Sequence, residues 1–176
     1  MLTSRYNFPA RMLHWLVAVL VVGQIILGYA ADRAEGTLAD MLLDRHVWVG
    51  LLILALVILR LLWRLAYPPP VLPMTTPDWQ RSAATGLHLL FYAILIVLPI
   101  SGYVLWAWIG SPLDWFGIVP SPILFTGGDD ETWRSIAGYT HIFAGYALMA
   151  MIAGHIGAAL WHEFVLRDRL IRDRML

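Results

Sequence analysis

The sequence predicts an all-α integral membrane protein, a four-helix transmembrane bundle with both termini inside (N-in/C-in). Three observations predict it: high apolar content, four long apolar windows and an uneven distribution of arginines. Of the 176 residues, 60% are hydrophobic and only 14% are charged, whereas a soluble domain carries about 25% charged residues. The four windows are Met12–Ala31, His46–Leu65, Leu87–Trp108 and Ile136–Trp161.

Each window holds about 20 or more residues, enough for a helix to cross a hydrocarbon core of about 30 Å. Helices satisfy their own backbone hydrogen bonds in lipid, which open sheet edges cannot do. We therefore expect residues 1–176 to form a single membrane domain with little mass outside the bilayer. Arg5 and Arg11 before the first apolar run are typical of a signal peptide, but the run is too long and carries His14, so we interpret it as a retained helix.

All twelve basic residues are arginines, and their positions set the predicted orientation. With the N-terminus inside, nine lie in inner segments and three, Arg33, Arg45 and Arg134, lie in outer ones. Acidic residues show the reverse distribution, with eight outside and four inside. An excess of arginine on the inner side predicts that both termini lie there.

The connections differ in composition. The outer segment 32–45 is short, and its LADMLLDRH portion (38–46) is compatible with an outward extension of the second helix. The inner loop YPPPVLPMTTPDW (67–79) is too rich in proline for a long helix. The outer loop 109–132 contains three consecutive acids, and Pro99 marks a candidate kink in the third helix.

Several function classes are excluded by composition. The chain has no cysteine, which excludes disulfides, thiolate iron–sulfur clusters, covalent c-type haem and cysteine-bound zinc. It also has no basic block of the length that nucleic-acid binding requires. Any cofactor must therefore be held by histidine, methionine, tyrosine or carboxylate side chains.

Histidines are the candidate ligands. One polar residue in a span is readily explained by a hydrogen bond to a neighbouring helix, but six in four spans are not. The six are His14, His46, His88, His141, His155 and His162.

The stretch HIFAGYALMAMIAGH begins at His141 and ends at His155. Fourteen residues at about 100° each fall about 40° short of four turns, so the two side chains share a helix face. They are about 21 Å apart along the axis, too far for one metal ion. Each histidine therefore needs its own partner at its own depth.

Chain direction supplies the partners. The second and fourth helices enter from outside, which places His46 and His141 together at the outer level. The first and third helices enter from inside, which places His14 and His88 beside His155, with His162 deeper toward the cytoplasm. Geometry alone does not decide between His14 and His88 as the partner of His155.

Two opposed imidazoles on facing helices are the site of a six-coordinate haem iron. Gly50 and Gly145 each lie four residues after an outer histidine, so both share the ligand's face and would let a macrocycle approach. Zinc fits less well, because tetrahedral zinc sites require four ligands and no carboxylate lies in the core. A proton or metal conduit would carry intramembrane carboxylates, of which the spans have almost none. The pattern predicts two b-type haems.

Local strings then add a family resemblance. They are RMLHW (11–15), HVWVG (46–50), RLLWR (60–64), HLLFY (88–92), PISGY (99–103) and GAALWH (157–162). With the paired histidines they resemble the prokaryotic di-haem cytochrome b561 family over nearly the whole chain, and the length is similar to that of enterobacterial members. The fourteen-residue histidine spacing is the most specific of these features.

The resemblance implies four helices and two haem b groups, one near each face of a bacterial cytoplasmic (inner) membrane that the chain crosses several times. It implies that His46 and His141 hold the outer iron and that His14 and His155 hold the inner iron. The cytochrome b subunits of formate dehydrogenase and hydrogenase share this cross-pairing. His88 and His162 then remain for quinone binding or proton delivery, or for an interfacial hydrogen bond to a haem propionate or loop carbonyl.

The resemblance also implies a reaction, because relatives oxidise superoxide outside and reduce ubiquinone. Arg45 adjoins His46, and Arg134 lies two turns before His141, so the two arginines could steer the superoxide anion to the outer haem edge. The alternative is that they bind haem propionates or pair with Asp44, Asp130 or Glu131.

A second functional hypothesis is an anchor subunit that relays electrons from a partner dehydrogenase to quinone. Lipid is the remaining expected partner. A conduit for protons or metal ions would bind no haem at all.

Overall fold

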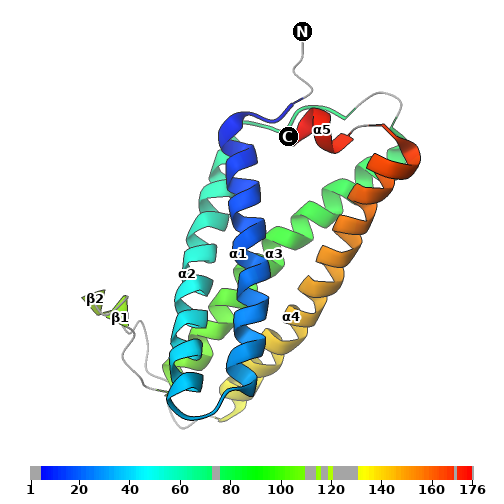
Figure 1. Cartoon of the computed structure of the whole chain (residues 1–176). Helices are drawn as coiled ribbons and strands as arrows, with labels where there is room; N and C mark the ends of the chain where they lie inside the picture. Colours follow the sequence, from blue (N-terminus) through cyan, green and yellow to red (C-terminus); the bar gives the residue numbers. More distant parts are fainter. Residues whose placement is uncertain are drawn as a thin grey trace.

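Four long helices form the protein (Figure 1). The computed structural model describes residues 5–72, 76–109, 114–115, 119–120, 131–168 and 170–175. The helices are α1 (Phe8–Arg33), α2 (Gly36–Ala66), α3 (Asp78–Ile109) and α4 (Glu131–Leu160), and α4 continues into the π-helix η1 (Trp161–Leu166). All four are long and apolar enough to cross a membrane. Each contains one predicted window, the last of which ends on the first residue of η1. The predicted all-α, four-helix transmembrane bundle is therefore confirmed, and its N-in/C-in orientation stays a prediction.

The ends of α1 and α2 follow local chemistry. The Asn7 side chain accepts a hydrogen bond from the Ala10 amide at 3.1 Å, and this caps the start of α1. Only residues 34 and 35 separate α1 from α2. Gly36 opens α2 with φ +59°, a conformation that glycine adopts without strain. The LADMLLDRH portion is therefore helical, as an outward extension of the second helix.

The other connection at this end of the bundle joins α3 to α4. Within it, β1 (Asp114–Trp115) pairs antiparallel with β2 (Val119–Pro120). The expected acid cluster at Asp129 and Asp130 lies outside the described residues. Pro99 lies inside α3, which is helical on both sides of it.

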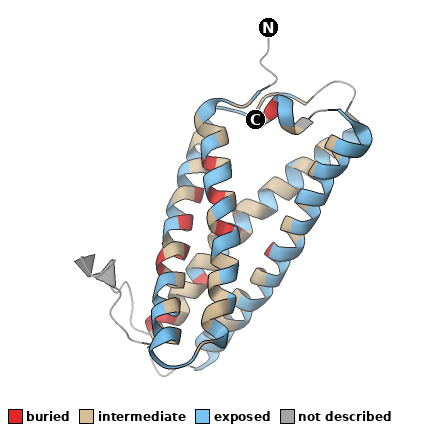
Figure 2. Ribbon diagram, in the orientation of Figure 1, coloured by how far each residue is buried: buried red, intermediate tan, exposed pale blue. Residues whose placement is uncertain are grey.

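The buried core is small for helices of this length. One cluster joins all four helices and comprises Val17, Val21, Ile53, Val57, Leu95 and Leu148. By contrast, large apolar side chains such as Leu89 and Phe143 are 71% and 65% exposed. Figure 2 shows buried positions mostly on α1 and α2, with the outward helix faces exposed. Such faces suit contact with lipid chains.

A short helix, α5 (Leu170–Arg174), lies across the end of the bundle that carries both termini (Figure 1). We call this the terminal end and the other the opposite end. The Arg174 guanidinium is buried and donates to the carbonyls of Pro70 at 2.5 Å and Val71 at 3.0 Å. The Trp15 indole N–H donates to the Met175 carbonyl at 3.2 Å. These bonds tie the C-terminal segment to α1 and to the α2–α3 loop.

Replacement of Arg174 by alanine should release α5 from this end. The change removes two hydrogen bonds from a charged donor and should cost about 2–3 kcal/mol of local stability. Amide hydrogen exchange of residues 170–175 measures the loss. The control is Arg172→Ala, which removes an ion pair between the exposed Arg172 and the largely buried Glu163 (2.6 Å) but keeps both Arg174 hydrogen bonds, so it should lower the protection less. Equal protection in both variants would contradict the role of Arg174.

Candidate functional site

The structure brings histidines together at both ends of the bundle. At the opposite end, the ring centroids of His46 on α2 and His141 on α4 are 6.0 Å apart, with an interplanar angle of 77°. At the terminal end, His155 on α4 lies 6.3 Å from His14 on α1 and 6.2 Å from His88 on α3. The two predicted levels are therefore present, with the expected residues at each.

These separations fit a metal ion between two imidazoles. A metal bonded to each ring nitrogen at about 2.0 Å, with each ring centre about 1 Å further back, places the centroids about 6 Å apart. Among the described residues, no group of three or more His, Cys, Asp or Glu side chains could hold a metal ion. An ion held by such a pair would need its other ligands from a non-protein group, and the four nitrogens of a porphyrin supply them.

His141 is oriented for metal binding by its neighbours on α3. Its Nδ1 lies 3.0 Å from the Leu98 carbonyl oxygen and 3.1 Å from Ser101 Oγ. A carbonyl only accepts hydrogen bonds, so Nδ1 carries the proton and Nε2 keeps its lone pair for a metal. The buried Ser101 hydroxyl in turn donates to the Leu98 carbonyl at 2.9 Å. Such outer contacts fix the tautomer and the ring orientation of metal-ligating histidines.

At the terminal end, His14 and His88 are both candidates for the ligand that would face His155. His88 Nδ1 donates to the Ala84 carbonyl at 2.6 Å, which also leaves its Nε2 for a ligand. His14 Nδ1 is buried without a hydrogen-bond partner in the described part of the chain, as is His46 Nδ1. Because His14 and His88 lie equally close to His155, the assignment of His14 as the ligand stays a prediction.

Two glycines that sequence reasoning missed make room for the opposite-end imidazoles. A Cβ added to Gly28 on α1 would lie 2.7 Å from His46 Cε1, and one added to Gly102 on α3 would lie 2.9 Å from His141 Cε1. Both distances are too short for real Cβ atoms. The contacts run between helices, so spacing along one helix could not reveal them. The only signal was the PISGY string, which contains Gly102.

The predicted glycines have different surroundings. Gly50 is buried, and a Cβ there would lie 3.2 Å from Gln24 Nε2, which donates to the His46 carbonyl at 2.6 Å. The small size of Gly50 is therefore already explained by the Gln24 amide. A Cβ at Gly145 would meet no atom within 4 Å. The expectation that either glycine admits a macrocycle stays a prediction.

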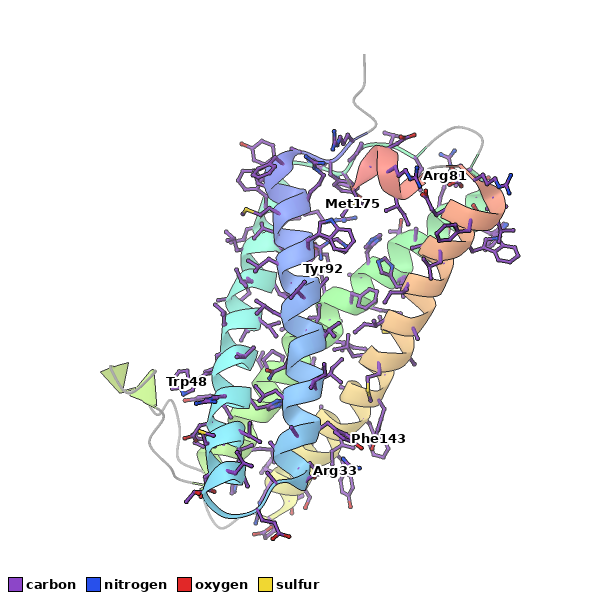
Figure 3. The ribbon with its side chains drawn as sticks, viewed as in Figure 1. Arg33, Trp48, Arg81, Tyr92, Phe143 and Met175 are labelled. Atoms are coloured by element: carbon purple, nitrogen blue, oxygen red, sulfur yellow. The ribbon has the colours of Figure 1, made fainter. Side chains whose placement is uncertain are left out.

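The outer arginines differ in their contacts. Arg134 pairs with Glu131 at 3.2 Å, which is one of the alternatives considered for it above. Arg33 lies 3.6 Å over the ring of Tyr29, and Figure 3 places Arg33 near the opposite end, as it does Phe143. Arg45 is exposed on α2, directly before His46.

His162 lies two helical turns beyond His155, away from the other terminal-end histidines. It lies on η1, about 10 Å along the axis beyond His155. Its Nδ1 is 2.5 Å from Asp168 Oδ2. This partner is a carboxylate of the C-terminal segment, not the haem propionate or loop carbonyl considered for His162, and the role of His162 in quinone binding or proton delivery stays a prediction.

Four membrane-crossing helices with facing imidazoles at two depths define the class of membrane-embedded b-type cytochromes. The sequence model of the family described as prokaryotic cytochrome b561 matches residues 5–176, and the chain belongs to that family. Membership implies haem b and electron transfer in a bacterial membrane.

Three relatives illustrate the family. "Cytochrome b561 homolog 2" of Escherichia coli (strain K12) is 30% identical over 98% of this chain and 92% of the relative. "Probable superoxide oxidase CybB" of Yersinia pestis is 31% identical over 98% of this chain and 96% of the relative. "Cytochrome b562" of Cereibacter sphaeroides is 28% identical over 93% of this chain and 90% of the relative.

Alanine at Gly28 or Gly102 should displace the adjacent imidazole and lower haem occupancy. Because the atoms nearest the added Cβ belong to an opposite-end histidine, we expect the haem-to-protein ratio to fall. The measurement is a pyridine haemochrome assay on purified protein. Gly23→Ala is the control, since a Cβ there would meet nothing within 4 Å. Full occupancy in both variants would show that these close contacts are not needed for haem binding.

Proposed function

We propose that this chain carries two bis-histidine haem b groups and transfers electrons from superoxide to ubiquinone. His46 and His141 would hold the haem at the opposite end, and His14 and His155 the haem at the terminal end. The observation that carries the proposal is the pair of imidazole separations near 6 Å at two depths. The chain would then act as a single di-haem domain.

The proposed orientation places the terminal end in the cytoplasm, in the bacterial inner membrane. It is supported by the nine arginines in segments near that end, against three near the other. The opposite-end site then faces the periplasm. Superoxide would be met there, because a small anion crosses lipid poorly.

Haem iron, when bound, supplies one-electron redox chemistry. With an imidazole on both sides, the iron would have no open position, so donors and acceptors would exchange electrons at the macrocycle edge. The histidines would hold the two groups at fixed depths, and the apolar helices keep water out. The reaction balances when two superoxide anions give two electrons and two O₂, and ubiquinone takes up two electrons and two protons.

Two observations support superoxide as the donor. A relative 31% identical to this chain is named a probable superoxide oxidase. In this chain, Arg45 is an exposed cation next to His46 and can raise the local concentration of a small anion. Because Arg134 is paired with Glu131, we assign the larger part of the steering to Arg45.

The quinone is proposed to react near the terminal end. The support is His88, which lies 6.2 Å from His155 and would be free to pass protons if His14 is the ligand. A protonatable side chain next to the haem is what quinone reduction requires, since each quinone takes up two protons.

Variants of the two terminal-end histidines should separate their roles. Replacing His14 by alanine should lower the haem-to-protein ratio from two to one, because the iron loses a ligand. His88→Gln should keep both haems in the reduced-minus-oxidised spectrum but slow ubiquinone reduction. His162→Gln serves as the control and should leave both readouts unchanged. Loss of haem from the His88 variant alone would reverse the ligand assignment.

Removal of the Arg45 charge should weaken the reaction with superoxide. Arg45→Gln should lower the second-order rate at low salt by about two- to tenfold and flatten its dependence on ionic strength. Stopped-flow haem reduction by superoxide measures this rate. Arg134→Gln is the matched variant, and its effect should be smaller because Glu131 already offsets that charge. Wild-type salt dependence in the Arg45 variant would refute steering, and a protein inert with superoxide would favour the relay from a partner dehydrogenase.

A further inference from the structure

Arg60 is an arginine within a membrane-crossing helix. It lies on α2, six residues before the helix ends at Ala66, and so about 9 Å inside that end. Its guanidinium carbon is 5.7 Å from the centre of the Tyr92 ring on α3. Figure 3 places Tyr92 within the bundle. Charged side chains at such depth are costly and usually serve a function.

Among the described residues, the groups that act electrostatically on Arg60 are Tyr6, Arg64 and Tyr92, and none of these is a carboxylate. Arg60 also acts on the three terminal-end histidines, and it is the strongest charged neighbour of His14 and His155, whereas Arg64 acts more strongly on His88. Arg33, Arg134 and Arg172, by contrast, are each paired with a carboxylate. The positive charge of Arg60 is therefore directed at the terminal-end site without an acidic side chain to offset it.

The opposite end has a different electrostatic arrangement. The Nδ1 proton of His141 is directed at two oxygens, the Leu98 carbonyl and Ser101 Oγ. Hydrogen bonding of this kind raises the basicity of a ligating imidazole and so favours the oxidised metal. The cation nearest in sequence to the opposite-end ligands, Arg45, is exposed, so water and salt screen its charge.

We propose that Arg60 makes the terminal-end haem the stronger electron acceptor of the two, so that electrons entering at the opposite end move to the terminal end. The inference rests on the proposed function, because it requires two haems. Reduction of one iron adds one negative charge while the other iron loses one, and no bond forms or breaks. The guanidinium stabilises that added charge across a medium of low dielectric constant.

The test is a redox titration of the purified protein, followed by haem absorption. The wild type should show two midpoint potentials. Arg60→Gln should lower the higher midpoint toward the lower one, leave the lower one in place and retain two haems. Arg60→Lys keeps the charge and should restore most of the difference between the two midpoint potentials. Arg172→Gln, which removes an exposed and paired cation at the same end, should move neither midpoint.

Single-haem variants assign the midpoints to the two ends. His46→Ala should retain only the terminal-end haem, which must titrate at the higher potential, and His14→Ala should retain only the lower one. The reverse order overturns the inference even if Arg60→Gln fails to fold. If Arg60→Gln binds two haems and the difference between their midpoint potentials is unchanged, the role of Arg60 is refuted but the proposed function is not. A wild-type protein that binds fewer than two haems would refute both.

Discussion

The face of α4 that carries His141 and His155 is the constraint on which the rest of the bundle depends. Fourteen residues separate the two side chains, so each points at a different partner helix at its own depth. His141 meets His46 of α2, and His155 meets His14 of α1 and His88 of α3. At the opposite end α2 therefore faces α4, and at the terminal end α1 and α3 face it. Gly28 on α1 and Gly102 on α3 leave room for His46 and His141, since a Cβ at either position would lie too close to the imidazole.

The apolar core has a position that follows from the same constraint. Along each helix, the members of the buried cluster fall between the two histidine levels. On α1, Val17 and Val21 follow His14, and on α2, Ile53 and Val57 lie between His46 and Arg60. On α3, Leu95 follows His88, and on α4, Leu148 lies between His141 and His155. Apolar side chains from all four helices pack the middle of the bundle. This layer holds the helices in register and keeps the two sites about 21 Å apart along α4.

Hydropathy and chain direction were enough to predict the four helices and the depth of each histidine, because both depend on residues near in sequence. Lateral neighbours were not predictable in this way. His14 and His88 remained equivalent by sequence, and they lie 6.3 and 6.2 Å from His155 in the structure. The contact of Gly28 with His46 joins two helices, and so does the bond from Gln24 to the His46 carbonyl. The fixed spacing along one helix contains no information about which residue of another helix lies beside it.

The C-terminal segment gives the terminal end a cover that bears on its electrostatics. Trp15 follows His14 directly in the chain, and its indole is bonded to the Met175 carbonyl. Arg174 holds the same segment to the α2–α3 loop through two carbonyls. A layer fixed in this way would limit the access of water from that end to the three terminal-end histidines. The field of Arg60 weakens as the local dielectric constant rises. Under the role proposed for Arg60, the hydrogen bonds of the C-terminal segment and the charge of Arg60 would therefore act on the same site, the first by limiting water and the second by placing a cation near it.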